Sequence, residues 1–76
     1  MEDILKQCNE YCKEVYSQCI DEYMKGKKNT DNNQRKARKY AIKQAFRFAL
    51  DKYENISPSY IWKRINIAHI YFYQKN

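Results

Sequence analysis

The stretch RKARKYAIKQAFRFALDKY, residues 35–53, carries the strongest structural signal in this chain. Placed on a helix that advances about 100° per residue, it carries four alanines spaced by four, Ala37, Ala41, Ala45 and Ala49. Larger apolar side chains are expected to flank this alanine ridge: Ile42, Phe46, Phe48, Leu50 and Tyr53. A neighbouring helix can approach a row of methyl groups closely. We therefore predict that this stretch is the central helix of a helical domain.

The remaining side of the same helix carries cations. Four of them recur every three or four residues and form what we call the basic stripe: Lys36, Lys39, Lys43 and Arg47. Arg35 lies near its start and Tyr40 lies beside it. Cations on a rigid helix can follow a phosphate backbone and release its counterions, and a tyrosine can stack on a base. These six residues are the candidate nucleic-acid contacts. The alternative is a solvated face that pairs with acidic residues, at about 0–1 kcal/mol per pair.

Glycine and proline, which interrupt secondary structure, occur once each in the 76 residues. This scarcity favours long helices over a sheet, which needs frequent turns. We predict an all-α fold in a single domain, residues 1–76, with helices at 3–25, 31–54 and 58–74. The expected arrangement is two long antiparallel helices plus a shorter C-terminal helix.

The predicted helix ends have local signals. Gly26 is placed to end the first helix in the left-handed conformation, and Asn55 is expected to adopt the same conformation after the second. The second helix can take its N-cap from one of three residues, Thr30, Asp31 or Asn32. Ser57 followed by Pro58 is typical of an N-cap and a first helical residue.

Apolar residues recur at helical spacing in both outer helices. In the first they are Ile4, Cys8, Tyr11, Val15 and Cys19, widened by Leu5, Cys12, Tyr16 and Tyr23. In the third, the core stripe is Ile61, Ile65, Ala68 and Phe72. The third helix is apolar nearly all round, so part of it should contact a protein partner, most simply in a homodimer. The candidate interface residues are Trp62, Ile67, Ile70 and Tyr71.

Charge divides the chain unevenly. Residues 1–24 carry a net charge of −4 and residues 25–76 carry +10, for a total of +6. A basic body of this kind suits nucleic acid, an acidic protein or an anionic membrane surface. AT-rich codon usage also favours Lys, Asn, Ile and Tyr, so the lysine excess has a second explanation.

Three cysteines, Cys8, Cys12 and Cys19, do not form the framework of a secreted disulfide-rich domain. The N-terminal segment lacks the apolar run of a signal peptide, and no stretch is long and apolar enough to span a bilayer. We expect an intracellular, reducing location and no membrane contact. With His69 the cysteines equal the ligand number of a zinc site, but they are spread along one helix face. Core packing is therefore the preferred interpretation, with no metal and no cofactor.

No catalytic motif is evident. The chain has no glycine-rich phosphate loop, no HExxH and no GxSxG. His69, the only histidine, has no serine or carboxylate in a recognisable arrangement with it, and we expect it at a helix boundary beside Trp62 and Tyr73. The protein is predicted not to be an enzyme.

The segment YENISPSYIWKRIN, residues 53–66, resembles the turn and recognition helix of phage-repressor-like proteins. The resemblance implies that five residues face DNA: Ser57, Ser59, Tyr60, Lys63 and Arg64. The turn has no glycine, the preceding helix is longer than usual, and the apolar positions of the third helix fall out of register. The family is therefore not assigned.

Two functions from different classes follow. The first is a small regulatory protein that binds nucleic acid through the basic stripe. The second is a protein-binding adaptor or inhibitor, of the kind that viruses, phages and mobile elements encode, with the third helix as its contact surface. Pure self-assembly is a third hypothesis.

Overall fold

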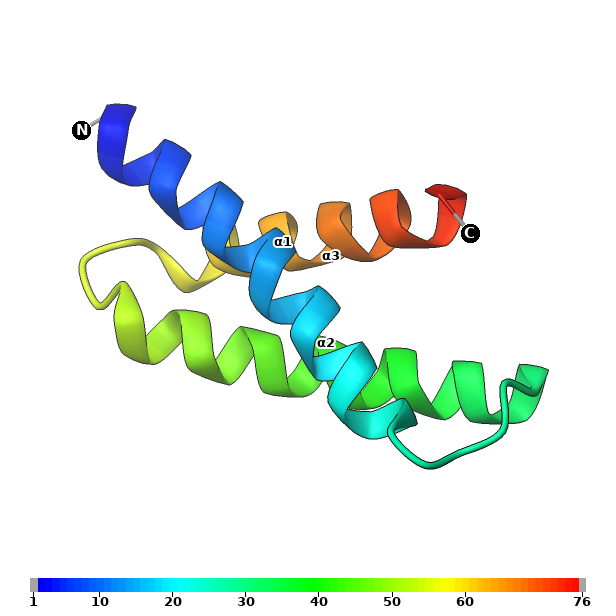
Figure 1. Ribbon diagram of the computed structural model, residues 1–76. Coiled ribbons are helices and arrows are strands. Elements are labelled where there is room, and N and C mark those ends of the chain that lie inside the picture. Colours follow the sequence, from blue (N-terminus) through cyan, green and yellow to red (C-terminus); the bar gives the residue numbers. More distant parts are fainter. Residues whose placement is uncertain (1, 76) are drawn as a thin grey trace.

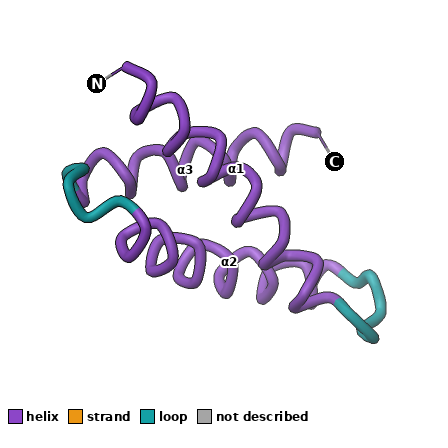
Figure 2. Tube along the Cα trace, turned by 60° about the vertical axis from the view of Figure 1, so that its left-hand side comes forward, coloured by secondary structure: helices purple, strands orange, loops and turns teal. Residues whose placement is uncertain are grey.

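The computed structural model describes the backbone of residues 2–75 and the side chains of residues 3–72. It has three helices, α1 (Glu2–Met24), α2 (Asp31–Lys52) and α3 (Pro58–Lys75), and no strand within residues 2–75. All three pairs of helices are in contact, α1 with α2 most extensively. α1 crosses α2 obliquely (Figure 1), and the two loops lie at opposite ends of the molecule (Figure 2). The all-α prediction is confirmed, and the antiparallel pairing and the dimer stay predictions.

The connection between α1 and α2 uses the signals that the sequence contains. Gly26 has a φ of 77°, the left-handed conformation that glycine adopts without steric cost. The Lys27 amide donates to the Met24 carbonyl at 2.9 Å, which closes the turn. Of the three candidate caps, Thr30 is the one used, because its hydroxyl accepts a hydrogen bond from the Asn33 amide at 3.2 Å.

The connection between α2 and α3 differs from the prediction at Asn55. No non-glycine residue in the described backbone has a positive φ, so the left-handed conformation predicted for Asn55 is wrong. The chain turns instead through a hydrogen bond from the Ile56 amide to the Tyr53 carbonyl at 3.2 Å, and the Ile56 side chain is buried. The Ser57 carbonyl then accepts the first bond of α3, from the Ile61 amide at 3.1 Å.

The core lies where the three helices meet. All four residues of the alanine ridge are fully buried, at 0% exposure. They face a line of side chains on α1 and another on α3: Cys8, Cys12, Val15, Tyr16, Cys19 and Ile20, and Ile61, Ile65 and Ala68. Because the ridge presents only methyl groups, larger side chains from α1 and α3 fill the space around it.

Two predicted core residues lie at the surface. Phe48 is 49% exposed and Ile4 is 41% exposed. A four-residue repeat drifts by about 40° per step around a helix, so the buried line on α2 has moved away from Phe48 by the time it reaches Ala49. Ile4 lies outside the buried line of α1, which begins at Cys8.

Candidate nucleic-acid interface

The basic stripe lies on the face of α2 that is turned away from the core. Each of its members is exposed, and so is Arg35. The alanine ridge occupies the opposite face of the same helix and is fully buried. The buried side therefore fixes α2 in the bundle and leaves the cations of the outer side accessible.

Tyr40 differs from the other candidate contacts because it is only partly exposed. Its ring lies 5.3 Å from the ring of Tyr23 on α1, at an interplanar angle of 42°. Lys27 contacts the Tyr23 side of this ring pair. Its Nζ lies 4.4 Å from the centre of the Tyr23 ring and donates a hydrogen bond to the Tyr23 carbonyl at 2.8 Å. Tyr40 thus helps to join α2 to α1, and only its outer edge is open to a ligand.

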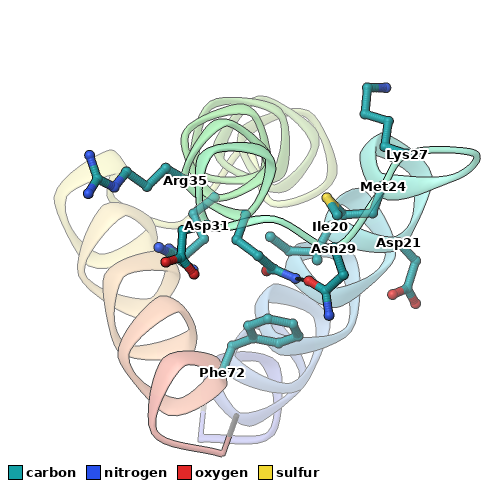
Figure 3. A pocket seen from close by; sticks show the side chains of 10 residues that line it. Ile20, Asp21, Met24, Lys27, Asn29, Asp31, Arg35 and Phe72 are labelled. Atoms are coloured by element: carbon teal, nitrogen blue, oxygen red, sulfur yellow. Dashed lines mark hydrogen bonds between the residues drawn. The ribbon is translucent and has the colours of Figure 1, made fainter.

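A hollow of about 830 Å³ lies at the end of the bundle where α1 ends and α2 begins. Its wall combines cations, acids, amides and apolar side chains: Ile20, Asp21, Met24, Lys27, Asn29, Asp31, Gln34, Arg35, Arg38 and Phe72. In Figure 3 the Phe72 ring lies on one side of it, while Lys27 and Arg35 point outward. The Gln34 amide donates to the Asn29 side chain within the wall. Such a mixed wall does not select one class of ligand.

The four candidate interface residues of α3 are all exposed: Trp62 by 45%, Ile67 by 37%, Ile70 by 54% and Tyr71 by 55%. Ile67, Ile70 and Tyr71 are three and four residues apart and share one face. Trp62 lies on another side of the helix, where its ring packs edge-on against Phe46 of α2 at 5.0 Å. The structure therefore brings three of the four residues together.

A buried polar contact joins α1 to α3. The hydroxyl of Tyr16, which is 1% exposed, lies 2.6 Å from Nδ1 of the partly buried His69. His69 was expected beside Trp62 and Tyr73. The His69 ring packs edge-on against Tyr16. Trp62 packs against Phe46, and the Tyr73 side chain lies outside the described residues. Because Tyr16 and His69 are 53 residues apart, periodicity within either helix could not pair them.

Burial favours the neutral form of both partners in this contact. It raises the pKa of Tyr16 to about 12, although the charge of Arg38 opposes the shift. Burial also lowers the pKa of His69, and the Arg38 charge lowers it further. With both groups neutral, the phenol donates to Nδ1 if the imidazole carries its proton on Nε2, and Nδ1 donates to the phenol oxygen in the other tautomer. A pair held in this way joins two helices and leaves no free nucleophile.

The three cysteines are free and buried, as the core-packing interpretation predicted. Burial raises the pKa of Cys12 to about 12, and the neighbouring Cys8 adds to the shift while Arg64 opposes it. Burial also raises the pKa values of Cys8 and Cys19. Thiols of this kind are poor nucleophiles and poor metal ligands, because both roles need the thiolate.

Within the described part of the chain, no three or more His, Cys, Asp or Glu residues are grouped so that they could hold a metal ion. None of the described helices is both long and apolar enough to cross a bilayer. Comparison with protein-family models, curated proteins and solved structures finds no match to this chain. Its function is therefore inferred from its own residues.

Proposed function

We propose that this is a small non-enzymatic protein that binds nucleic acid through the basic stripe of α2. The observation that carries the proposal is the contrast between the two faces of this helix. The alanine ridge is fully buried on one side, and every cation of the stripe is exposed on the other. The stripe is thus a row of cations on a rigid support.

The length of the stripe suits a polyanion. Lys36 and Arg47 are eleven residues apart, which corresponds to about 16 Å along the helix axis. Cations spread over this length contact several phosphates along one groove or strand, and each neutralised phosphate releases counterions. Such binding depends on salt and reads little sequence. The partial burial of Tyr40 adds to this view, because a half-buried ring has little surface left for stacking on bases.

The test removes charge from the stripe without disturbing the helix. In a variant with Lys39→Gln, Lys43→Gln and Arg47→Gln, we expect a large loss of affinity for a short DNA or RNA duplex at low salt. The slope of log K against log salt should fall in magnitude by about 3, because each lost phosphate contact removes about 0.9. Electrophoretic mobility shift or fluorescence anisotropy over a salt series measures both quantities.

The matched control loses the same net charge elsewhere. Lys6, Lys25 and Lys52 are exposed and lie outside the stripe, so their replacement by Gln should change the affinity far less. Circular dichroism checks that both variants keep their helix content. If the wild-type protein binds neither DNA nor RNA at low salt, or if the two variants lose affinity equally, the proposal fails.

A second function, an adaptor or inhibitor that binds another protein, is supported by the exposure of Ile70 and Tyr71. Each of these residues is more than half exposed. Large apolar and aromatic side chains are common at protein interfaces, so their exposure here fits a surface that a partner covers. Absence of nucleic-acid binding by the wild-type protein would favour this second function over the first.

A further inference from the structure

The bundle has two outer faces of different character. Figure 3, which looks along the bundle, has α2 on one side and α1 and α3 together on the other. The basic stripe lies on the outer side of α2. The opposite side, which we call the α1–α3 face, is formed where the exposed surfaces of these two helices adjoin.

The α1–α3 face has an apolar centre. Ile67 and Ile70 lie one turn apart on α3 and are both exposed. Tyr71 is beside them, and Nζ of Lys13 on α1 lies 5.6 Å from the centre of its ring. This contact shows that the surface continues from α3 onto α1. Two isoleucines exposed next to an aromatic ring are a typical centre for a protein contact.

The two helices of this face carry charges of opposite sign around the centre. On α1, the exposed Glu10 is one turn from Lys13, and the exposed acids of the same helix continue with Asp3, Glu14 and Asp21. On α3, the exposed Lys63 is one turn from Ile67, and residues 58–75 contain no acid. Lys6 and Lys13 reduce the negative charge on α1 but do not cancel it. The α1 edge of the face is therefore acidic, whereas the α3 side carries an exposed cation in line with the isoleucines and no acid.

We propose that the occupant of the α1–α3 face is a second copy of this chain, and that the resulting dimer bridges two segments of nucleic acid. A surface with acids on one helix and a cation without acids on the other complements itself after a two-fold rotation. In such an isologous pair each contact occurs twice, so Glu10 of each copy faces the cations of the other copy's α3. The isoleucines of both copies are then buried at the centre.

The orientation of the pair gives it a function beyond single-site binding. Since the basic stripe lies opposite the α1–α3 face, dimerisation places the two stripes on opposite outer sides. One segment of nucleic acid cannot contact both, whereas two segments can each contact one. The bridging step rests on the proposed function, while the dimer itself does not.

The first experiment separates dimerisation from binding. Replacement of Ile67 and Ile70 by Ser should weaken the dimer by more than about 100-fold, because four apolar side chains leave the centre. Sedimentation equilibrium measures this change. The wild-type protein should retain a fluorescent duplex on beads that carry a second duplex, and the double serine variant should not. Fluorescence anisotropy with a single duplex should still detect binding by the variant. Phe48→Ser, which removes an exposed apolar side chain of α2, is the control and should change neither association nor bridging.

The outcomes of that experiment distinguish the dimer, its contact surface, the bridging step and the proposed function from one another. A wild-type protein that stays monomeric at tens of micromolar overturns the proposal and leaves the face to a different protein. A dimer that survives the double serine substitution overturns the assignment of the surface. A dimer that binds nucleic acid but does not join two duplexes overturns bridging. A dimer that binds no nucleic acid shows that the proposed function fails, and bridging fails with it.

The second experiment tests the complementarity of the edges. Glu10→Lys and Lys63→Glu should each weaken self-association by about tenfold, because exposed pairs that occur twice turn from attractive to repulsive. An equimolar mixture of the two variants should recover a heterodimer, since each reversed edge then meets an oppositely charged edge. Failure of the mixture to associate overturns the α1-to-α3 pairing.

Discussion

The alanine ridge of α2 and the contact between α1 and α3 build the same core by different means. The ridge consists of methyl groups only, all at 0% exposure. The α1–α3 contact combines large and polar side chains, with the Tyr16 hydroxyl bonded to His69 and the Tyr16 ring 5.7 Å from the ring of Phe72. One contact depends on small volume and the other on hydrogen bonding and protonation.

The two contacts are sensitive to different changes. A close-packed row of small side chains has no room for added atoms, yet it contains no group that titrates. A contact built from a phenol and an imidazole tolerates small changes in shape, but it loses free energy when either partner loses its hydrogen bond. The following substitutions test this contrast, in order of expected effect.

Ala45→Leu should have the largest effect. The side chain at this position is fully buried, so three added carbon atoms force the helices apart at a cost of about 1–3 kcal/mol. In a domain of this size, the upper part of that range is a large fraction of the total stability. Urea unfolding followed by circular dichroism measures the change.

The control for Ala45→Leu is Lys43→Leu, which adds an apolar side chain to the exposed face of the same helix. Leucine and lysine have similar helix propensities, so the free energy of unfolding should stay within about 0.5 kcal/mol of wild type. An equal loss in both variants would show that the ridge is not packed as described.

Tyr16→Phe should have an intermediate effect. It keeps the buried ring and removes the hydroxyl that bonds His69 Nδ1. We expect a loss of about 1 kcal/mol, because the partly buried imidazole nitrogen loses its hydrogen-bond partner. A double-mutant cycle with His69→Gln isolates the pair, and a coupling free energy near zero would contradict the hydrogen bond.

The smallest effect is expected from pH. Burial and the Arg38 charge lower the pKa of His69 in the folded state, so the unfolded chain binds this proton more readily. The free energy of unfolding should therefore fall as the pH is lowered from about 7.5 to 5.5 and level off below the folded-state pKa. Tyr16, the other titratable group at this contact, stays neutral throughout this range because its pKa is about 12.

Thermal unfolding in a pH series measures this dependence, and His69→Gln provides the reference without the imidazole. The free energy of unfolding of the wild type relative to His69→Gln should change with pH only below about pH 7. A wild-type stability that rises relative to His69→Gln as the pH falls would contradict the neutral state of His69.

The sequence predicted the elements and the buried side of each helix better than the contacts between helices. The alanine ridge and the start of α3 at Pro58 follow from local spacing and local hydrogen bonding, and the cap at Thr30 is one of the three candidates that the sequence offered. The exposure of the basic stripe follows from the same periodicity. A nucleic-acid partner does not, because spacing does not specify what a charged face binds.

The contacts that were missed depend on how one helix is placed against another. The pairing of Tyr16 with His69, and of Trp62 with Phe46, joins residues from different helices. Helical periodicity gives the direction of each side chain around its own axis. It does not give the axial offset or the crossing angle that selects a partner. The exposure of Phe48 has a different origin, because the buried line winds around α2 and moves away from this residue.

The three buried thiols have a consequence for measuring motion in this protein. Cys8, Cys12 and Cys19 lie in one row on α1, each almost fully covered by the other helices. A thiol reagent reaches such a sulfur only when the surrounding helices separate, so its rate of reaction depends on how often they open. The native cysteines therefore report the separation of α1 from the bundle, which alkylation and mass spectrometry can follow without any added label.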